Sequence, residues 1–598
     1  MCGIAGFTGR GDIGVLRRMT DAIRHRGPDA DGNWAEENAG VFLGHRRLSI
    51  IDLTGGAQPM WTADGKLGIT FNGEIYNHAE LRAELVQCGC QFVTDHSDTE
   101  VLLHAYREWG DGFVERLNGM WAFVIYDREK RRLFGSRDRF GKKPLYYFHE
   151  GTTFGFASEL TALTRHPDCP RSISPLALKK YFAHCYIPAP RSIYERVWKL
   201  PGGHSFTFDL ASGKLNVSRW WEFVIRSIPQ EMIARGVIPR VQCGESLQEE
   251  IRETLERAVK RRLMSDVPLG VFLSGGIDSS AIAALAAKLI PSGQLNTFSV
   301  GFNDPSFDES SYARLVAEKL GTRHHEEILD LDKSVALIPE IVSSLDEPLG
   351  DSSLLPTFLL SRFTRQHVTV ALGGDGGDEL FAGYDPFRAL RKAELYAKLV
   401  PKPIHAGIRH LAARLPVSHA NISLDFKIKR TLMGLSYPPP LWNAVWMSAL
   451  EPRDINQLFQ EPTPIEEIYS EAIEAWDRCA QPNIVDRALQ FWTNIYLQDG
   501  ILAKVDRASM MNSLEVRSPF LDIEFVDLVR RIPWQQKLWM GKTKWVLKQA
   551  LGPLLPNEII GRPKKGFGMP IGRWLTEGKF TIDPAETAPL LDPQFIAK

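Results

Sequence analysis

The chain has 598 residues, of which 44% are hydrophobic and 24% charged, and this composition predicts packed cores distributed over several domains. The formal net charge of −1 gives no reason to expect a nucleic acid or a membrane surface as a partner. No run approaches the roughly 18 apolar residues of a spanning helix, and the N-terminus lacks the charged and apolar stretches of a secretory signal.

The seven cysteines are scattered, odd in number and without a C-x-x-C pair. This pattern favours reduced thiols in a cytoplasm over disulfides or a zinc site. One of them, Cys2, directly follows the initiator methionine. Once that methionine is removed, the thiol lies beside an α-amine with a pKa of about 7.7–8.0, and this amine can act as its base. Cys2 is therefore a candidate N-terminal nucleophile, and an inert cysteine at the start of a strand is the alternative.

Polar segments follow Cys2 at the ends of predicted helices and strands. They are Arg24-His25-Arg26-Gly27-Pro28-Asp29 after a helix predicted at 15–23, His45-Arg46-Arg47-Leu48-Ser49-Ile50-Ile51-Asp52, Asn72-Gly73-Glu74-Ile75-Tyr76-Asn77 after a strand predicted at 67–71, and Ser97-Asp98-Thr99-Glu100 at the start of a helix. Together with Cys2, these segments resemble the class II glutamine amidotransferase domain. The resemblance extends from residue 2 to about residue 200.

The resemblance implies that this region hydrolyses glutamine to glutamate and ammonia. Cys2 would attack the side-chain amide, and the Asn72 side chain with the Gly73 backbone N–H would hold the oxyanion, each donor being worth a few kcal/mol in such sites. An arginine fork would bind the α-carboxylate, and two carboxylates would recognise the α-amino end. The glutamine-binding residues assigned in this way are Arg47, Asn72, Gly73, Glu74 and Asp98.

The rest of this region predicts further strands. They are expected at 120–127, 132–137 and 144–148. We therefore expect residues 2–205 to form an α+β glutaminase domain with the αββα layers of N-terminal nucleophile enzymes. The basic turn at 138–147 is interpreted as a solvated, structural turn. Prolines and glycines between 186 and 204 break regular structure, and residues 206–245 are expected to form a linker.

A second domain is expected at 246–580, beginning with a helix at 246–265. An apolar run at 267–273 predicts a buried strand, and 281–289 predicts a helix. Between them lies Ser274-Gly275-Gly276-Ile277-Asp278-Ser279-Ser280. A glycine turn between a strand and a helix N-terminus binds anions, because backbone N–H groups and the helix dipole act on the same ligand.

Strands and helices alternate beyond this loop. The predicted strands are 296–301, 325–328 and 368–372, and a helix is predicted at 309–320. The alternation predicts an α/β doubly wound parallel sheet with its site at the carboxyl ends of the strands. The strand at 368–372 runs into Gly373-Gly374-Asp375-Gly376-Gly377-Asp378-Glu379. Glycines and carboxylates at this density suit a loop that binds a nucleotide and Mg²⁺.

The segment 274–279 resembles the pyrophosphate loop of N-type ATP pyrophosphatases, and the whole chain resembles glutamine-hydrolysing asparagine synthetases of the bacterial B type. The resemblance implies ATP and Mg²⁺ as cofactors. ATP would adenylate the aspartate side chain, and ammonia, delivered through an internal passage, would attack the acyl-adenylate. The implied ATP-binding residues are Leu273, Ser274, Gly275, Gly276, Asp278, Ser279, Ser280, Val300, Gly373 and Gly374, and the implied magnesium ligands are Asp278 and Asp378.

Two further positions bear on the chemistry. Lys544 aligns best with the phosphate-facing lysine of the family, and Lys542 is the alternative. Asp375 would lie near the acyl-adenylate, where the best-studied members have glutamate, and aspartate is one methylene shorter. This departure leaves the acceptor open. The segments 504–510 and 514–522 also resemble family segments and are interpreted as structural.

Other functions remain to be weighed. The same chemistry on another carboxylate, such as a uronic acid of a surface polysaccharide, is the main alternative. A catalytically silent binding protein is disfavoured because Cys2, Asn72, Asp278 and Asp378 are all present. A tRNA-modifying pyrophosphatase is disfavoured because the chain has neither a basic excess nor a cysteine pair. The sequence does not determine the oligomeric state, and a homodimer is expected only by analogy with the family.

Overall fold

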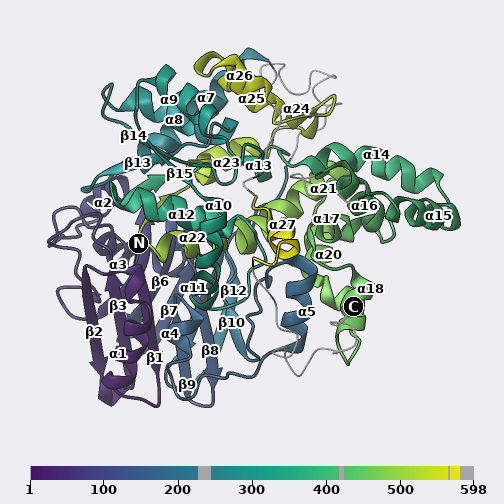
Figure 1. Ribbon diagram of the computed structural model, residues 1–598. Helices are drawn as coiled ribbons and strands as arrows, with labels where there is room; N and C mark the ends of the chain where they lie inside the picture. The colour runs from purple at the N-terminus through teal and green to yellow at the C-terminus, as the bar shows by residue number, and fades with distance from the viewer. Residues whose placement is uncertain (1, 227–243, 417–422, 563–565, 567, 580–598) are drawn as a thin grey trace.

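The computed structural model describes residues 2–226, 244–416, 423–562, 566 and 568–579. In Figure 1 the N-terminal strands, in purple and blue, lie side by side in the lower part of the molecule. The C-terminal strands lie above them among helices, and a group of helices projects to the right.

Two six-stranded antiparallel sheets form the first domain. The first sheet has the order β10 (Val197–Lys199), β8 (Tyr146–Glu150), β9 (Thr153–Ala157), β1 (Gly3–Thr8), β3 (Val41–Arg47) and β2 (Ala30–Glu36). The second has the order β12 (Leu215–Arg219), β11 (His204–Asp209), β7 (Arg132–Arg137), β6 (Gly119–Asp127), β5 (Leu67–Ile75) and β4 (Met60–Trp61).

The two sheets pack face to face through apolar side chains. Leu43 of the first sheet and Val124 of the second are fully buried in one cluster, as alternating strand residues should be. Helices cover both outer faces. They are α1 (Ile13–Ala22), α4 (Leu160–Leu163) and α5 (Pro175–His184) on the first sheet, and α2 (His78–Gln87) and α3 (Asp98–Trp109) on the second. The predicted αββα arrangement is confirmed.

Five parallel strands form the sheet of the second domain. Their order is β15 (Arg323–Leu329), β14 (Asn296–Phe302), β13 (Leu269–Phe272), β16 (Val370–Leu372) and β17 (Glu515–Arg517). The chain proceeds outward from β13 to β15 and then returns to the other side of β13. The loops after β13 and β16 are therefore neighbours, which is where doubly wound sheets bind ligands.

Helices cover both faces of this sheet, as predicted. α8 (Ile277–Leu289) and α9 (Ser310–Leu320) share one apolar cluster, and α12 (Leu354–Arg365) and α22 (Ala503–Met510) share another. The remaining α-helices within the described residues are α7 (Glu245–Arg262), α10 (Leu331–Ser334), α11 (Ile338–Ser343), α13 (Gly377–Leu380), α14 (Asp385–Leu399), α15 (Lys402–Ala413), α16 (Leu424–Gly434), α17 (Trp442–Met447), α18 (Pro452–Leu458), α19 (Ile465–Ile468), α20 (Ser470–Asp477), α21 (Ile484–Phe491), α23 (Ile523–Val529), α24 (Trp534–Lys537), α25 (Trp545–Leu551), α26 (Asn557–Gly561) and α27 (Ile571–Thr576).

The junction between the domains differs from the expected boundary at residue 205. That residue lies inside β11, which pairs with β7 from Ser205 to Asp209, and β12 then adds an edge strand. The sheet continues past 205 because both strands find backbone partners there. Residues 227–243 of the expected linker, and residue 580 at the expected end of the second domain, lie outside the described residues.

Two observations bear on the environment of the protein. The six cysteines within the described residues are free thiols. No described helix combines the length and the apolar character needed to cross a membrane.

One buried histidine makes the stability of the first domain depend on pH. His184, on α5, lies between the rings of Tyr186 and Tyr469. Burial, followed by the charge of Lys180, lowers the pKa of His184 to about 3. An unfolded histidine has a pKa of about 6.5. As the pH falls below that value the unfolded state takes up a proton first, so stability is lost toward acid.

We expect His184→Phe to reduce this acid sensitivity. Below about pH 6.5 the wild type should lose up to about 1.4 kcal/mol per pH unit more than the variant, since only the wild type gains a proton on unfolding. Thermal unfolding midpoints across a pH series measure the difference. Equal pH slopes for the two proteins would contradict the assignment.

Candidate active sites

Cys2 lies at the start of β1 and against β5. Its backbone nitrogen donates to Asn72 Oδ1 at 3.0 Å, and its Sγ donates to the Leu48 carbonyl oxygen at 3.8 Å. Burial raises the pKa of the Cys2 thiol. Asn72 is fully buried, and its Nδ2 has no hydrogen-bond partner among the described residues. A buried donor left unpaired in the side chain that holds Cys2 is suited to an oxyanion.

The other residues predicted to bind glutamine surround this pair. A side chain at Gly73 would meet the carbonyl oxygen of Met120 at 2.1 Å, so only glycine fits. Arg47, at the end of β3, is held by the carbonyl oxygens of Leu53 at 3.0 Å and Asp52 at 2.6 Å. The structure therefore places the predicted arginine at the last residue of β3, with its guanidinium held by the loop that follows.

Glu74 and Asp98 form a buried acidic pair. Asp98 begins α3, and its Oδ2 accepts from the Ile75 backbone at 3.1 Å. Glu74 Oε2 lies 3.2 Å from Nη2 of Arg517, which belongs to β17 of the second domain. Burial, followed by repulsion from Asp98, raises the pKa of Glu74 well above its ordinary value, and burial raises the pKa of Asp98. Two buried carboxyls with raised pKa values titrate as a pair.

The predicted pyrophosphate loop joins β13 to α8. Ser274 N donates to Ser279 Oγ at 3.2 Å, and the two hydroxyl oxygens are 3.1 Å apart. Gly275 has a φ of +67°, and a side chain there would meet Cβ of Tyr312 at 2.5 Å. This residue must therefore be glycine. The result is a tight turn at a helix N-terminus, which is the geometry that binds phosphate.

The second predicted loop follows β16 and touches the first. A Cβ atom at Gly374 would lie 2.9 Å from Cβ of Asp278, and one at Gly377 would lie 2.5 Å from Oδ1 of Asp278. The glycines therefore allow the two loops to meet. Leu273 and Val300, predicted to line the adenosine pocket, are both buried; Leu273 directly follows β13, and Val300 lies within β14.

Lys544 joins the two predicted magnesium ligands. Its Nζ forms ion pairs with Asp278 and, at 2.6 Å, with Asp378. Burial lowers the pKa of Lys544, but the two carboxylates more than offset this, and the pKa is raised. Lys542 is exposed and lies over the ring of Trp545. Of the two candidate lysines, the structure thus places Lys544 at the site.

Asp375 is held by residues that the sequence did not assign to the site. Its Oδ2 accepts from Ser518 Oγ at 3.2 Å and lies 3.8 Å from Nζ of Lys142, which donates to Ser518 Oγ at 2.7 Å. The interpretation of the 138–147 turn as solvated is wrong, since Lys142 and Lys143 are buried. The Asp138 carboxylate accepts both of their backbone N–H groups, and the second domain covers the turn.

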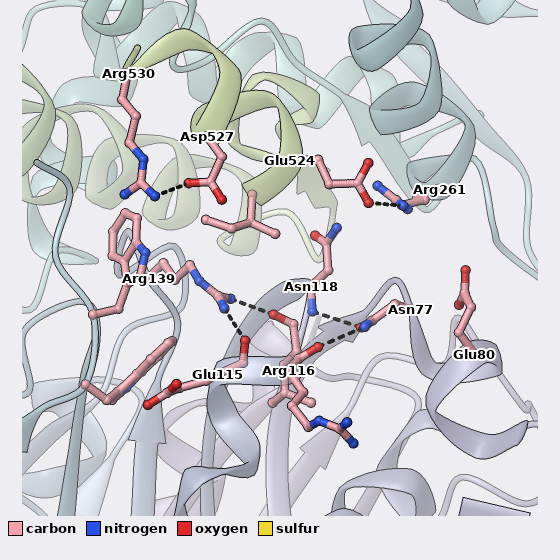
Figure 2. Close-up of a pocket in the computed structure, with 14 residues that line it drawn as sticks. Asn77, Glu80, Glu115, Arg116, Asn118, Arg139, Arg261, Glu524, Asp527 and Arg530 are labelled. Atoms are coloured by element: carbon pink, nitrogen blue, oxygen red, sulfur yellow. Dashed lines mark hydrogen bonds and ion pairs between the residues drawn. The ribbon is translucent and has the colours of Figure 1, made fainter. Parts of the chain in front are cut away.

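A cavity of about 530 Å³ lies at another part of the domain junction. Figure 2 shows Arg139 of the first domain, whose guanidinium donates to backbone carbonyls, and the ion pairs Arg530–Asp527 and Arg261–Glu524 of the second. No predicted site residue lines this cavity. Since these charged groups already have partners, we assign no ligand to it.

Comparison with known proteins assigns both halves of the chain. The sequence model of the asparagine synthase family matches residues 250–586, which is more than half of the chain. The chain belongs to the asparagine synthase family. A second model, of the glutamine amidotransferase domain, matches residues 1–221 and so includes β11 and β12.

Relatives of this asparagine synthase family member match it over most of its length. A putative glutamine-hydrolysing asparagine synthetase of Mycobacterium tuberculosis is 35% identical over 611 residues, covering 99% of this chain and 90% of the relative. Asparagine synthetase 1 of Bacillus subtilis is 33% identical, covering 96% of this chain and 88% of the relative. A putative asparagine synthetase of Methanocaldococcus jannaschii is 34% identical, covering 86% and 98%.

A buried arginine links the two domains of this asparagine synthase family member. Arg26 Nε donates to the Cys2 carbonyl oxygen at 3.1 Å. Its Nη1 donates to Glu159 at 2.7 Å, and Nη1 and Nη2 donate to the two oxygens of Asp506 at 2.8 and 3.1 Å. Burial raises the pKa of Asp506, but Arg26 more than offsets this, so the pKa is lowered. Cys2, the candidate nucleophile, is thus bonded through one side chain to α22.

A π-helix, η7 (Trp492–Leu502), supplies further contacts at the junction. Gln498 Oε1 accepts from the Gly202 backbone at 2.8 Å, and Asp499 Oδ2 accepts from the Ala189 backbone at 2.9 Å. The helix therefore holds the proline- and glycine-rich segment that leads out of the first domain. π-Helical segments are rare and often mark functional sites.

Sequence reasoning missed the residues that connect the domains. Arg26, Lys142, Asp506 and Arg517 were assigned no chemistry, although Arg26, Asp506 and Arg517 lie in segments with family resemblance. The available signal was weak: Asp506 has the apolar neighbours Val505 and Ala508, as a buried charge would. Its partner Arg26 is 480 positions away, so no local pattern could identify the pair.

We expect Asp506→Asn to destabilise the protein strongly. It leaves Arg26 buried without its bidentate partner, and breaking a buried pair in this way costs about 3–5 kcal/mol. Thermal unfolding measures the effect. Asp21→Asn is the matched control, because Asp21 is 66% exposed in its ion pair with Arg46 and should change stability by less than about 1 kcal/mol. Similar effects of the two substitutions would refute the structural role of Asp506.

Proposed function

We propose that this chain is a glutamine-dependent asparagine synthetase, a cytoplasmic enzyme acting on small molecules. Glutamine would be hydrolysed at Cys2, ATP would adenylate aspartate, and ammonia would displace AMP to give asparagine, with diphosphate as the other product. The observation that carries the proposal is the pairing of two sites in one chain. Asn72 holds Cys2 in the first domain, an Asp278–Lys544–Asp378 cluster lies in the second, and buried bonds such as Arg26–Asp506 join the two domains.

In the glutaminase half, the free α-amine of Cys2 would take the thiol proton as the sulfur attacks the amide carbon. The unpaired Nδ2 of Asn72 supports a role in holding the oxyanion. Loss of ammonia leaves a thioester, which water hydrolyses to glutamate. Arg47, Glu74 and Asp98 would orient the glutamine by its α-carboxylate and α-amine.

In the synthetase half, the turn at 274–280 would receive the diphosphate end of ATP. Mg²⁺ bound by Asp278, Asp378 and phosphate oxygens would neutralise the charge that builds up on the leaving diphosphate. Two carboxylates suit this ion, which takes its remaining ligands from phosphates and water. Lys544, already paired with both carboxylates, would contribute its charge to the same phosphates.

The acceptor carboxylate would lie near Asp375. The Asp375 side chain is one methylene shorter than a glutamate side chain, so its reach toward the acceptor is shorter. Ser518 and Lys142 set the position of the Asp375 carboxylate. The uronic acid alternative keeps every other step and changes only the molecule bound here. The family assignment supports aspartate.

Cys2→Ala should separate the two reactions. We expect glutamine-dependent diphosphate release to fall to background, because the nucleophile is lost, while ammonia-dependent release continues. Assays with each nitrogen source measure both. Cys88→Ala is the control, since Cys88 is exposed and should leave both activities unchanged. Equal loss of the two activities in Cys2→Ala would contradict the two-site scheme.

An acceptor screen tests the proposed function directly. With glutamine, ATP and Mg²⁺ present, we expect aspartate to stimulate diphosphate release and asparagine to form in equal amounts. Glucuronate and galacturonate serve as the alternative acceptors. No response to aspartate overturns the asparagine assignment, and a response only to a uronic acid establishes the alternative.

A further inference from the structure

The helix α15 carries an apolar stripe that no described residue covers. Ile404, Ile408, Leu411 and Leu415 are exposed, and Leu411 is 64% exposed. Their spacing of four, three and four residues places them on one face of the helix and its C-terminal turn. The other side of α15 packs against α16. The exposed stripe is therefore separate from the side of α15 that packs against the rest of the fold.

The neighbouring helices also expose apolar side chains. Leu395 and Leu399 are exposed on α14, four residues apart, and Leu424 and Ile428 are exposed on α16 with the same spacing. Lys427 of α16 pairs with Asp385 of α14 at 2.7 Å, so the three helices form one lobe. Nearly half of the large hydrophobic side chains exposed in the described chain lie between residues 395 and 428. Such a concentration indicates an interaction surface.

The same lobe is strongly basic. Residues 385–430 contain ten lysines and arginines against three acidic residues, a net charge of +7, whereas the whole chain has a net charge of −1. Two such lobes would repel each other, which disfavours a second copy of this chain as the occupant. Exposed apolar stripes flanked by basic side chains are instead the features of helices that lie on anionic bilayers.

We propose that α14, α15 and α16 dock the enzyme on the surface of a bilayer that contains anionic lipids. In Figure 1 these helices project from one edge of the molecule, with α15 outermost, so a flat surface can approach them. The leucines and isoleucines enter the interface, and exposed cations such as Lys392, Lys402 and Arg414 pair with lipid phosphates. The net charge of the whole chain does not indicate this basic surface, because acidic residues elsewhere cancel its positive charge.

Vesicle co-sedimentation of the full-length enzyme tests the proposal. We expect binding to vesicles of phosphatidylcholine with phosphatidylglycerol, weaker binding as salt is raised, and none to phosphatidylcholine alone. Leu399→Gln with Leu411→Gln should lower the affinity by about tenfold or more, since each leucine loses its burial in the interface. Val93→Gln with Val342→Gln is the matched control, because both residues are exposed outside the lobe and should leave binding unchanged.

Each result decides the question. Circular dichroism and glutamine-dependent turnover in solution should be unchanged in both double variants, which shows that they fold. Failure of the wild type to bind anionic vesicles overturns the proposal, as does equal binding by the lobe variant. Sedimentation velocity without lipid tests whether a second copy of the chain binds the lobe instead. A wild-type oligomer that becomes a monomer in the lobe variant would show a protein interface and would also overturn the proposal.

Discussion

The buried guanidinium of Arg26 is the contact on which the two-domain arrangement depends. It bonds to the backbone of Cys2, to Glu159 in its own domain and to Asp506 in the other. A guanidinium without water must have every charge compensated, and a fork of two bonds to one carboxylate sets both distance and orientation. A fully buried cation therefore bonds both the Cys2 backbone and a carboxylate of α22.

Strand β17 extends this link to both candidate sites. Arg517 reaches Glu74 beside the glutamine site, and its carbonyl oxygen accepts from Gly373 at 2.8 Å in the nucleotide loop. The next residue, Ser518, bonds to Asp375 and Lys142. One edge strand thus contacts the residues predicted to bind glutamine and those predicted to face the adenylate. This explains why a segment without chemistry of its own carries so many buried charges.

Charge in this protein is meaningful locally rather than as a sum. The net charge of −1 does not reveal the buried ion pairs at the domain interface or the basic lobe with exposed apolar side chains at α14–α16. The two kinds of site follow opposite rules. Buried charges need partners because desolvation is costly, whereas exposed cations of the lobe such as Lys392 and Lys402 stay hydrated and can face an external anionic surface.

The sequence by itself determined the chemistry that depends on neighbouring residues. The turn at 274–280 and the alternation that predicts a parallel sheet are local, because backbone geometry and hydrophobic period act over a few residues. The strand predicted at 67–71 instead continues to Ile75, so Asn72 lies inside β5. The tertiary structure alone decided which charges are buried and with whom. The lysines at 142 and 143 resemble a solvated turn until the second domain covers them, and Arg26 meets Asp506 only through folding, since contacts between distant segments leave no periodic trace in the chain.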